Sequence, residues 1–324
     1  MSAFQTLEAG NTIGDKYGRL GFTNVTMIPP PLGLRGLILG ACNSGKSYLL
    51  QSCPEMFIFN LDLSSTVVRD LPATIWPGLT PEGRPFDPEE GEIILTYDRV
   101  KRKLETLHQM AMDQYEGRPR CIAFDSTSSL IRLLRKHAIE NAPLLGLKKE
   151  PVAQWNDLDG QAAWEWVYST IEDLVIDLPN DGYGVYFVMH LVDKILRIDR
   201  DHQEKYTAVN ITDNFKSRIW NLFELVGAVI ETTEYELGEK REIKTADGRH
   251  LKWDQSMMEC RKRYFVSDPG VVAGNLDADN DLVKHRITIP GKIELPSTDP
   301  WAAFTTAYEA AATLIPPSPQ KDES

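Results

Sequence analysis

Apolar positions follow two alternating patterns over the first 195 residues of the chain. Residues 98–115 and 160–178 carry apolar side chains every three or four positions, which predicts amphipathic helices, and residues 46–52 are expected to be the beginning of another helix. Four short runs are apolar at successive positions and predict buried strands: residues 34–39, 56–61, 120–124 and 184–189. Strands that alternate with helices predict a parallel sheet with crossover helices on its faces.

The pattern changes after residue 195. Short polar and apolar segments there predict antiparallel strands added to one edge of the sheet. These segments are residues 226–235, 242–245, followed by an Asp247-Gly248 turn, and 257–266. Residues 298–314 predict a final amphipathic helix. The Pro/Gly-rich stretch at 71–91 falls between predicted elements, and we expect it to be a surface excursion.

One main domain is expected, because 324 residues suffice for a single α/β core with decorations. We assign residues 1–32 to an N-terminal extension that ends in three prolines, whose missing amide donors suit a stiff lead-in. Residues 33–315 are expected to form the domain and residues 316–324 a disordered tail. The predicted fold class is α/β, with a parallel sheet flanked by helices and C-terminal antiparallel strands.

The formal net charge of −12 works against broad attraction to a phosphate backbone, so any contact with nucleic acid must be local. The four cysteines lack C-x-x-C spacing, which argues against a zinc ribbon and a disulfide framework. No apolar run approaches the roughly 20 residues of a membrane span, and the N-terminus lacks an export pattern. These features predict a cytoplasmic protein that is neither exported nor membrane-embedded.

The segment GACNSGKS, Gly40 to Ser47, matches the phosphate-binding pattern G-x-x-x-x-G-K-[ST] between a predicted strand and a predicted helix. Its glycines let successive backbone amides face one anion, and the helix N-terminus adds its dipole. Lys46 is expected to neutralise the β- and γ-phosphates of ATP, and the Ser47 hydroxyl to bind Mg²⁺. The predicted nucleotide contacts are Gly40, Ala41, Cys42, Asn43, Ser44, Gly45, Lys46, Ser47 and Tyr48. A chance match, or nucleotide binding without hydrolysis, is the alternative.

Two aspartates follow predicted strands near this loop. Asp125 ends the strand at 120–124, taken as a neighbour of the loop strand, and is predicted to hold Mg²⁺, because ligands bind at the carboxyl ends of parallel strands. Capping the next helix is the alternative role for Asp125. Ser126 stands where many motor ATPases carry a catalytic glutamate, so Asp62, at the end of the second strand, is predicted to be the general base. Glu55 is the weaker rival because it precedes that strand.

These motifs together resemble RecA-like ATPases, and more narrowly the phage-encoded nucleotide-binding proteins of the single-strand-annealing, recombination-mediator type. The resemblance covers residues 33–315 and rests on the phosphate-binding loop, the Asp-Ser pair that begins at Asp125, and the strand end at Asp62. It implies a RecA-like P-loop NTPase core that hydrolyses ATP with Mg²⁺ and forms a homo-oligomer.

The resemblance also implies roles for three residues later in the chain. His190 ends the fourth strand, where RecA-like proteins place a residue that senses the γ-phosphate; a hydrogen-bonded core or loop histidine is the alternative. Arg261 and Arg263 have the spacing with which related ring ATPases reach a neighbouring subunit's nucleotide. Their alternative role is a solvated strand face.

Single-stranded DNA is the implied substrate, contacted by the segments after the third and fourth strands, residues 136–159 and 191–214. These segments mix cations with acidic residues, and Trp155 offers a face for base stacking or for core packing. The cations concerned are Lys148, Lys149, Lys194, Arg197, Arg200 and Lys205.

The expected function is ATP-dependent action on single-stranded DNA in phage-type recombination or replication, inside a bacterial host cell, with a single-strand-binding protein as a further partner. The first alternative is an ATPase that acts on protein partners, such as a helicase loader or assembly factor, which the acidic balance would suit. The second is a non-hydrolysing, nucleotide-dependent scaffold.

Overall fold

A computed structural model describes most of the chain. The described residues are 31–63, 71–197, 203–209, 218–237, 241–244, 250–254, 257–267, 284–285 and 291–313. Nearly all of the expected N-terminal extension, the expected tail and the Asp247-Gly248 turn lie outside these ranges. No helix within them is long and apolar enough to cross a membrane.

A mixed sheet organises the described residues. Its strands run in the order β15-β13-β10-β1-β8-β7-β2-β3, and all neighbours from β10 to β3 are parallel, whereas β13 and β15 are antiparallel additions. This arrangement confirms the predicted parallel sheet with antiparallel strands at its C-terminal edge. The strands are β1 (Arg35–Gly40), β2 (Met56–Asn60), β3 (Thr74–Trp76), β7 (Cys121–Asp125), β8 (Gly184–Arg197), β10 (Leu225–Leu237), β13 (Met257–Val266) and β15 (Lys292–Leu295).

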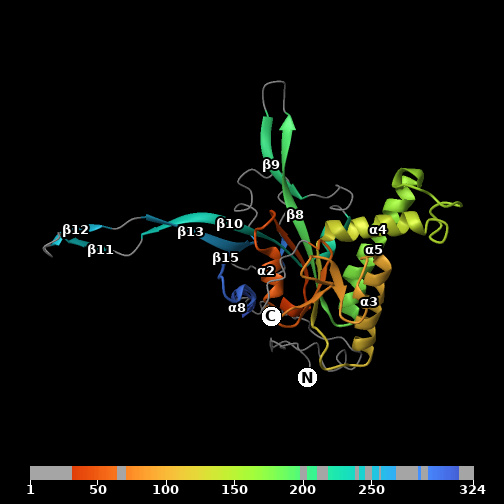
Figure 1. The fold of residues 1–324 in the computed structure, drawn as a ribbon, viewed down its shortest axis with the longest axis horizontal. Coiled ribbons are helices and arrows are strands. Elements are labelled where there is room, and N and C mark those ends of the chain that lie inside the picture. Colours follow the sequence, from red (N-terminus) through yellow and green to blue (C-terminus); the bar gives the residue numbers. More distant parts are fainter. Residues whose placement is uncertain are drawn as a thin grey trace, which may run out of the picture.

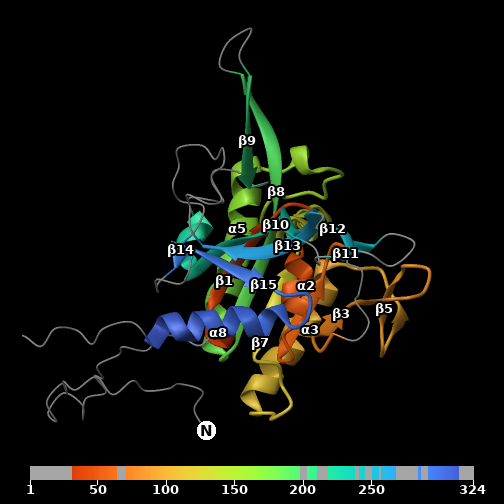
Figure 2. The same ribbon diagram turned by 90° about the vertical axis from the view of Figure 1, so that its left-hand side faces the viewer.

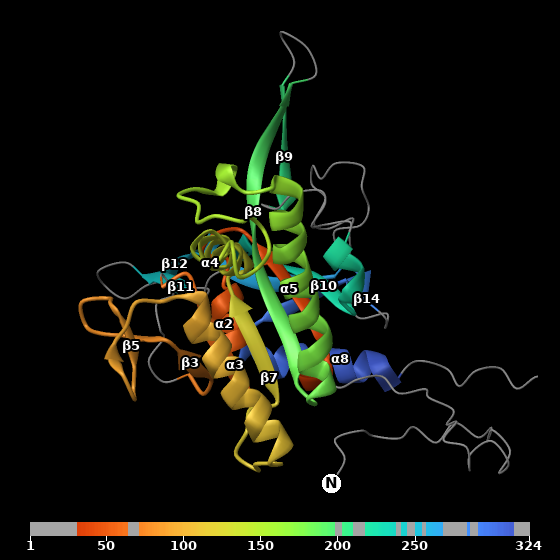
Figure 3. The same ribbon diagram turned by 90° about the vertical axis from the view of Figure 1, so that its right-hand side faces the viewer.

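Helices cover both faces of the sheet. Alternate residues of β1 serve the two faces: Leu37 and Leu39 join one apolar core, and Ile38 joins the other. The helices α3, α4 and α5 cover the first face (Figure 3), and α2 and α8 cover the second (Figure 2). Their bounds are α2 (Lys46–Gln51), α3 (Tyr97–Met112), α4 (Thr127–Glu140), α5 (Gly160–Asn180) and α8 (Pro300–Thr313). The α/β fold class is therefore confirmed.

The stretch at 71–91 is not only a surface excursion, which corrects the prediction. Strand β3 within it pairs with β2 and extends the main sheet, and Trp76 is 4% exposed. The Trp76 indole donates a hydrogen bond of 2.5 Å to Asp87. A three-residue strand among prolines and glycines is too short to produce a readable apolar pattern. The rest forms a small antiparallel sheet of β4 (Gly78–Leu79), β5 (Pro85–Asp87) and β6 (Gly91–Glu92).

Strand β10 also differs from its prediction as an antiparallel edge strand. Its apolar first half pairs in parallel with β1. The antiparallel pairing with β13 begins at Ala228 within the core and continues along the polar second half, which extends beyond the core. The β10–β13 pair projects to the left in Figure 1, where β11 (Arg241–Lys244) and β12 (His250–Asp254) form a separate small sheet. We call residues 230–237 of β10, together with their pairing partners 257–264 of β13, the β10–β13 arm.

Strand β8 is more than twice as long as the predicted run at 184–189. Beyond the core it pairs with β9 (Gln203–Val209), so that Leu191 faces Val209 and Arg197 faces Gln203. The resulting β8–β9 hairpin projects upward in Figure 1, away from the helices. The sequence pattern missed this extension because charged residues follow the apolar run.

Candidate functional site

The loop between β1 and α2 has the backbone that a phosphate-binding loop needs. Gly45, which caps α2, has a φ of 100°, a conformation that side-chain-bearing residues rarely adopt. A side chain at Gly40 would lie 2.5 Å from the carbonyl oxygen of Val229 on β10. The glycines of the motif are therefore required where they stand, and the helix N-terminus that follows suits an anion.

Lys46 is the first residue of α2, directly after the loop, and is only 4% exposed. Its Nζ donates hydrogen bonds to the carbonyl oxygens of Gly40 at 2.9 Å and Ala41 at 2.6 Å. Burial lowers the pKa of Lys46, and the nearby carboxylate of Asp125 opposes that shift. A buried ammonium beside backbone amides is chemically suited to the phosphates of a nucleotide.

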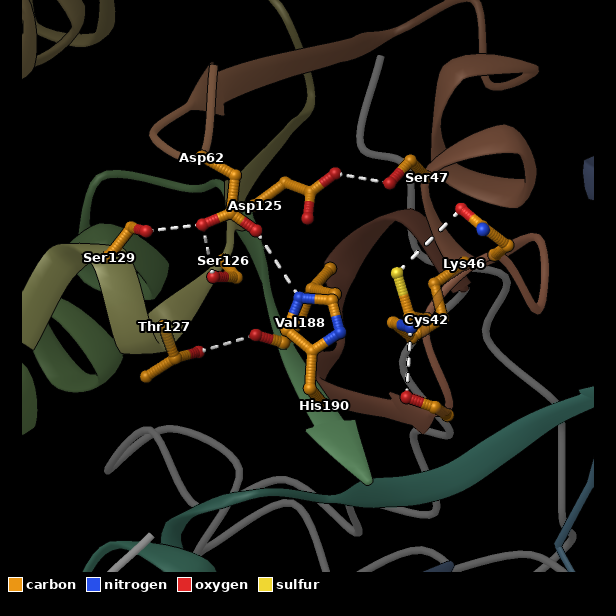
Figure 4. A network of polar contacts seen from close by, with 12 residues as sticks. Cys42, Lys46, Ser47, Asp62, Asp125, Ser126, Thr127, Ser129, Val188 and His190 are labelled. Carbon is orange, nitrogen blue, oxygen red and sulfur yellow. Dashed lines mark hydrogen bonds and ion pairs between the residues drawn. The ribbon is translucent and has the colours of Figure 1, made fainter. Parts of the chain in front are cut away.

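Ser47 and Asp125, the two residues predicted to hold Mg²⁺, are in contact at the edge of the sheet where the loop lies (Figure 4). The Ser47 hydroxyl donates a hydrogen bond of 2.5 Å to Oδ2 of Asp125, which is 5% exposed. Burial raises the pKa of Asp125, and the bond from Ser47 opposes that shift. A hydroxyl and a carboxylate oxygen beside the loop fit the preference of Mg²⁺ for oxygen ligands.

The strand of Asp125 is not the neighbour of the loop strand, which corrects one detail of the prediction. Strand β8 lies between β1 and β7, and all three are parallel, so their carboxyl ends reach the same edge of the sheet. The N-cap position of α4 is Ser126, and the Asp125 carboxylate accepts a hydrogen bond from Ser47, so Asp125 does not occupy the capping position of this helix. A cis peptide bond joins Asp125 and Ser126.

Asp62 is the centre of a polar network at this edge (Figure 4). Its Oδ1 accepts hydrogen bonds from Ser126 at 2.8 Å and from Ser129, and its Oδ2 lies 3.2 Å from Nε2 of His190. The structure therefore brings two predicted residues, Asp62 and His190, into contact. Ser129 was missed, although it follows Ser126 by three positions and so shares a face of α4.

The network determines the ionisation of Asp62. Burial alone would raise the pKa of Asp62, but the hydrogen bonds from His190, Ser129 and Ser126 outweigh burial and lower that pKa to about 2. Asp62 is therefore a carboxylate at neutral pH and a weak proton acceptor. Such a group can orient a water molecule by accepting a hydrogen bond, which narrows the predicted role of general base.

The rival carboxylate, Glu55, lies at the wrong end of the sheet. Glu55 precedes β2, and its side chain pairs at 3.3 Å with Arg120, which precedes β7. Because β2 and β7 are parallel, this ion pair lies at their amino ends, opposite the phosphate-binding loop. Glu55 is therefore excluded as the catalytic base.

His190 lies directly beside the phosphate-binding loop. It pairs in register with Gly40, the last residue of β1. The Thr127 hydroxyl at the start of α4 donates a hydrogen bond of 2.9 Å to the carbonyl oxygen of Val188, two residues earlier on β8 (Figure 4). Strand β8 is thus connected to the loop strand on one side and to the Asp125 strand and α4 on the other.

The two arginines of β13 have different surroundings. Arg263 approaches Gly45 of its own chain, since a Cβ at Gly45 would lie 2.8 Å from its Cδ, and its Nε donates a hydrogen bond of 3.2 Å to Glu231. The side chain of Arg261 is 73% exposed, with Glu231 3.9 Å away. Contact with a neighbouring subunit stays a prediction for both arginines.

Other predicted residues lie in varied positions. Cys42 is exposed and contacts Asn43, and the Tyr48 hydroxyl donates a hydrogen bond of 2.5 Å to the carbonyl oxygen of Ser297. Ser44 is buried. Trp155 packs against Trp164.

The predicted DNA-contacting cations are spread over two regions. Lys148 and Lys149 are exposed in the loop that follows α4. The predicted segment 136–159 begins in the last turn of α4 and continues through this loop. Lys194, Arg197 and Lys205 belong to the strands of the β8–β9 hairpin. Arg200 lies outside the described residues.

A comparison with known families identifies the domain. A family model described as an AAA domain matches residues 32–263, which is most of the chain. No curated protein matches the chain. The match covers the phosphate-binding loop, Asp62, Asp125, His190 and both arginines, and it supports an ATP-binding P-loop domain of the ATPase type. The chain therefore belongs to this family of AAA domains.

Proposed function

We propose that the chain is a Mg²⁺-dependent, RecA-like ATPase that forms an oligomer and acts on single-stranded DNA in phage-type recombination or replication, in the cytoplasm of a bacterial host. The observation that carries the proposal is the course of β8. This strand passes the phosphate-binding loop at His190 and continues into the projecting β8–β9 hairpin, so one element connects the nucleotide site to a protruding surface.

The residues of the site have different roles in the proposed hydrolysis of ATP. Lys46 and the loop amides would bind the phosphates, and Ser47 and Asp125, which are in contact, would hold Mg²⁺. Bound Mg²⁺ supplies positive charge that offsets the charge of the phosphate oxygens. Asp62 accepts a hydrogen bond from the attacking water and aligns it with the γ-phosphate, while Ser126 and Ser129 hold the carboxylate in place.

His190 provides the connection to DNA. The ring of His190 contacts Asp62. When the γ-phosphate binds or leaves, the hydrogen bonds of Asp62 would change, and the hydrogen bond between Asp62 and His190 would change with them. Lys194, Arg197 and Lys205 lie further along the hairpin and would contact the phosphate backbone locally, as the acidic chain requires. Arg261, the more exposed arginine, would reach the nucleotide of a neighbouring subunit.

Two measurements test the proposal. ATP turnover is compared with and without single-stranded DNA for wild type, Lys46→Ala and Asp62→Asn. Equal background rates in all three proteins would exclude the proposal that this chain hydrolyses ATP. Binding of a labelled oligonucleotide is followed by anisotropy at rising salt, with wild type, Lys194→Ala/Arg197→Ala and the control Lys101→Ala/Arg102→Ala, which removes two exposed charges from α3. The affinity of wild type for the oligonucleotide is expected to fall as the salt concentration rises. At a given salt concentration, Lys194→Ala/Arg197→Ala is expected to bind more weakly than wild type, and the control variant is expected to bind as wild type does.

The net charge of −12 favours one rival, an ATPase that acts on a protein partner such as a helicase loader or assembly factor. ATP turnover without any oligonucleotide binding at low salt would support this rival. If a single-strand-binding protein strengthens the binding of the oligonucleotide to this chain, the role in recombination would instead be supported.

A further inference from the structure

The phosphate-binding loop rests on the base of the β10–β13 arm at both of its glycines. At its first end, a side chain on Gly40 would lie 2.5 Å from the carbonyl oxygen of Val229, so β10 is in close contact with the loop. At its second end, a Cβ on Gly45 would lie 2.8 Å from Cδ and 3.1 Å from Nε of Arg263 on β13. Two independent contacts therefore connect the loop to the same pair of strands.

Arg263 is held in this position by the strand beside it. Residues 231 and 263 are direct partners in the antiparallel pairing of β10 and β13, and Arg263 Nε donates to Glu231 Oε2 at 3.2 Å. The Cδ, Nε and Cζ atoms of Arg263 lie 2.8, 3.1 and 3.6 Å from the position that a Cβ on Gly45 would occupy. The side chain of Arg263 thus occupies the space beside Gly45 into which a side chain at that position would extend.

We infer that Arg263 is a positioning residue for the phosphate-binding loop of its own chain, and that Arg263 and Glu231 couple this loop to the β10–β13 arm. The inference rests on the proposed nucleotide binding and differs from a role in a neighbouring subunit. Movement of Gly45 towards β13 when phosphate binds would displace the Arg263 side chain, because that side chain fills the space beside Gly45. The arm then responds to the nucleotide through the Arg263–Glu231 pair.

The test uses hydrogen exchange and nucleotide binding on the full chain. The variants are Arg263→Ala, the conservative Arg263→Lys, Glu231→Gln and the control Lys262→Ala, which removes the neighbouring cation of β13 and its bond to Glu236. Without nucleotide, Arg263→Ala is expected to speed exchange of the loop amides at 41–45, and Lys262→Ala to leave it as in wild type. A fluorescent ATP analogue is expected to bind Arg263→Ala about 3- to 10-fold more weakly than wild type. The affinity of Arg263→Lys is expected to lie between those of wild type and Arg263→Ala.

The arm provides the second readout. Addition of the analogue to wild type and to Lys262→Ala is expected to change exchange at 230–237 and 257–263, and this change is expected to be lost in Arg263→Ala and reduced in Glu231→Gln. Equal loop exchange in Arg263→Ala and Lys262→Ala would overturn the inference. Failure of wild type to bind the analogue would overturn the proposed function, while loop exchange without nucleotide still decides whether Arg263 positions the loop.

Discussion

Nε2 of His190 lies 3.2 Å from Oδ2 of Asp62, so the end of β2 and the end of the core part of β8 meet through their side chains. The contact joins the carboxylate proposed to orient water with the strand that leads to the β8–β9 hairpin. It connects the candidate site directly to the strand that forms the projecting β8–β9 hairpin. The predictions below separate the role of each residue in this arrangement.

Replacement of Asp62 by Asn is expected to lower kcat for ATP about 10²- to 10³-fold, because the amide cannot orient water as the carboxylate does. The nucleotide Kd is expected to change less than about threefold, since Asp62 does not belong to the phosphate-binding loop. Steady-state turnover and analogue binding measure the two effects. Glu55→Gln, which alters a carboxylate at the opposite end of β2, is the matched control. Loss of turnover in Glu55→Gln with full turnover in Asp62→Asn would reverse the assignment.

The Asp62 network predicts a pH dependence of stability. The folded-state pKa of Asp62 is about 2, below its ordinary value of 3.8, so ionised Asp62 stabilises the folded state. This contribution is about 2 kcal/mol at most, is fully present above about pH 4, and is lost as the pH falls from about 4 towards 2. Urea unfolding should show that wild type exceeds Asp62→Asn in stability by a margin that shrinks below pH 4. A margin that stays constant from pH 7 to pH 3 would contradict the low pKa.

Asp125 and Ser47 are expected to show opposite effects on stability. Burial raises the pKa of Asp125, so its charge at neutral pH costs stability, and Asp125→Asn should raise the unfolding free energy by about 1 kcal/mol. Ser47→Ala leaves that charge without its hydrogen bond and should lower the unfolding free energy by about 1–3 kcal/mol. Both variants should lose the Mg²⁺-dependent part of nucleotide affinity. Denaturation without nucleotide and titrations with and without Mg²⁺ measure these effects.

Mixing of variants distinguishes action on the same chain from action on a neighbour. If Arg261 serves a neighbouring subunit, an inactive Arg261→Ala protein mixed with inactive Lys46→Ala should regain turnover, because the second protein supplies the arginine. Mixing Arg263→Ala with Lys46→Ala should not raise the turnover of Arg263→Ala, since Arg263 lies against the loop of its own chain. Turnover of the mixtures at several ratios is the measurement. Recovery in the Arg263 mixture would show that this residue also acts between subunits.

Much of this arrangement can be read from sequence because it depends on local patterns. The phosphate-binding loop is a contiguous motif, and apolar runs locate the parallel strands that carry Asp62 and Asp125 to one edge. The short strand β3 was missed because its burial is decided by pairing with β2, not by its own composition. Arg263 beside Gly45 could not be read either, because more than 200 residues separate them and the register of β13 brings them together.

The position of β8 between β1 and β7 determines the order in which the site can be completed. Ser47 and Asp125 are both made before residue 184, but β1, which leads into the loop before Ser47, and β7, which ends at Asp125, are each neighbours of β8 and not of each other. A ribosome-bound chain that ends before β8 therefore contains every ligand of the expected metal site and lacks the strand that sets their separation. The ability to hold Mg²⁺ and triphosphate should arise late in synthesis, together with the same strand that extends to the projecting hairpin.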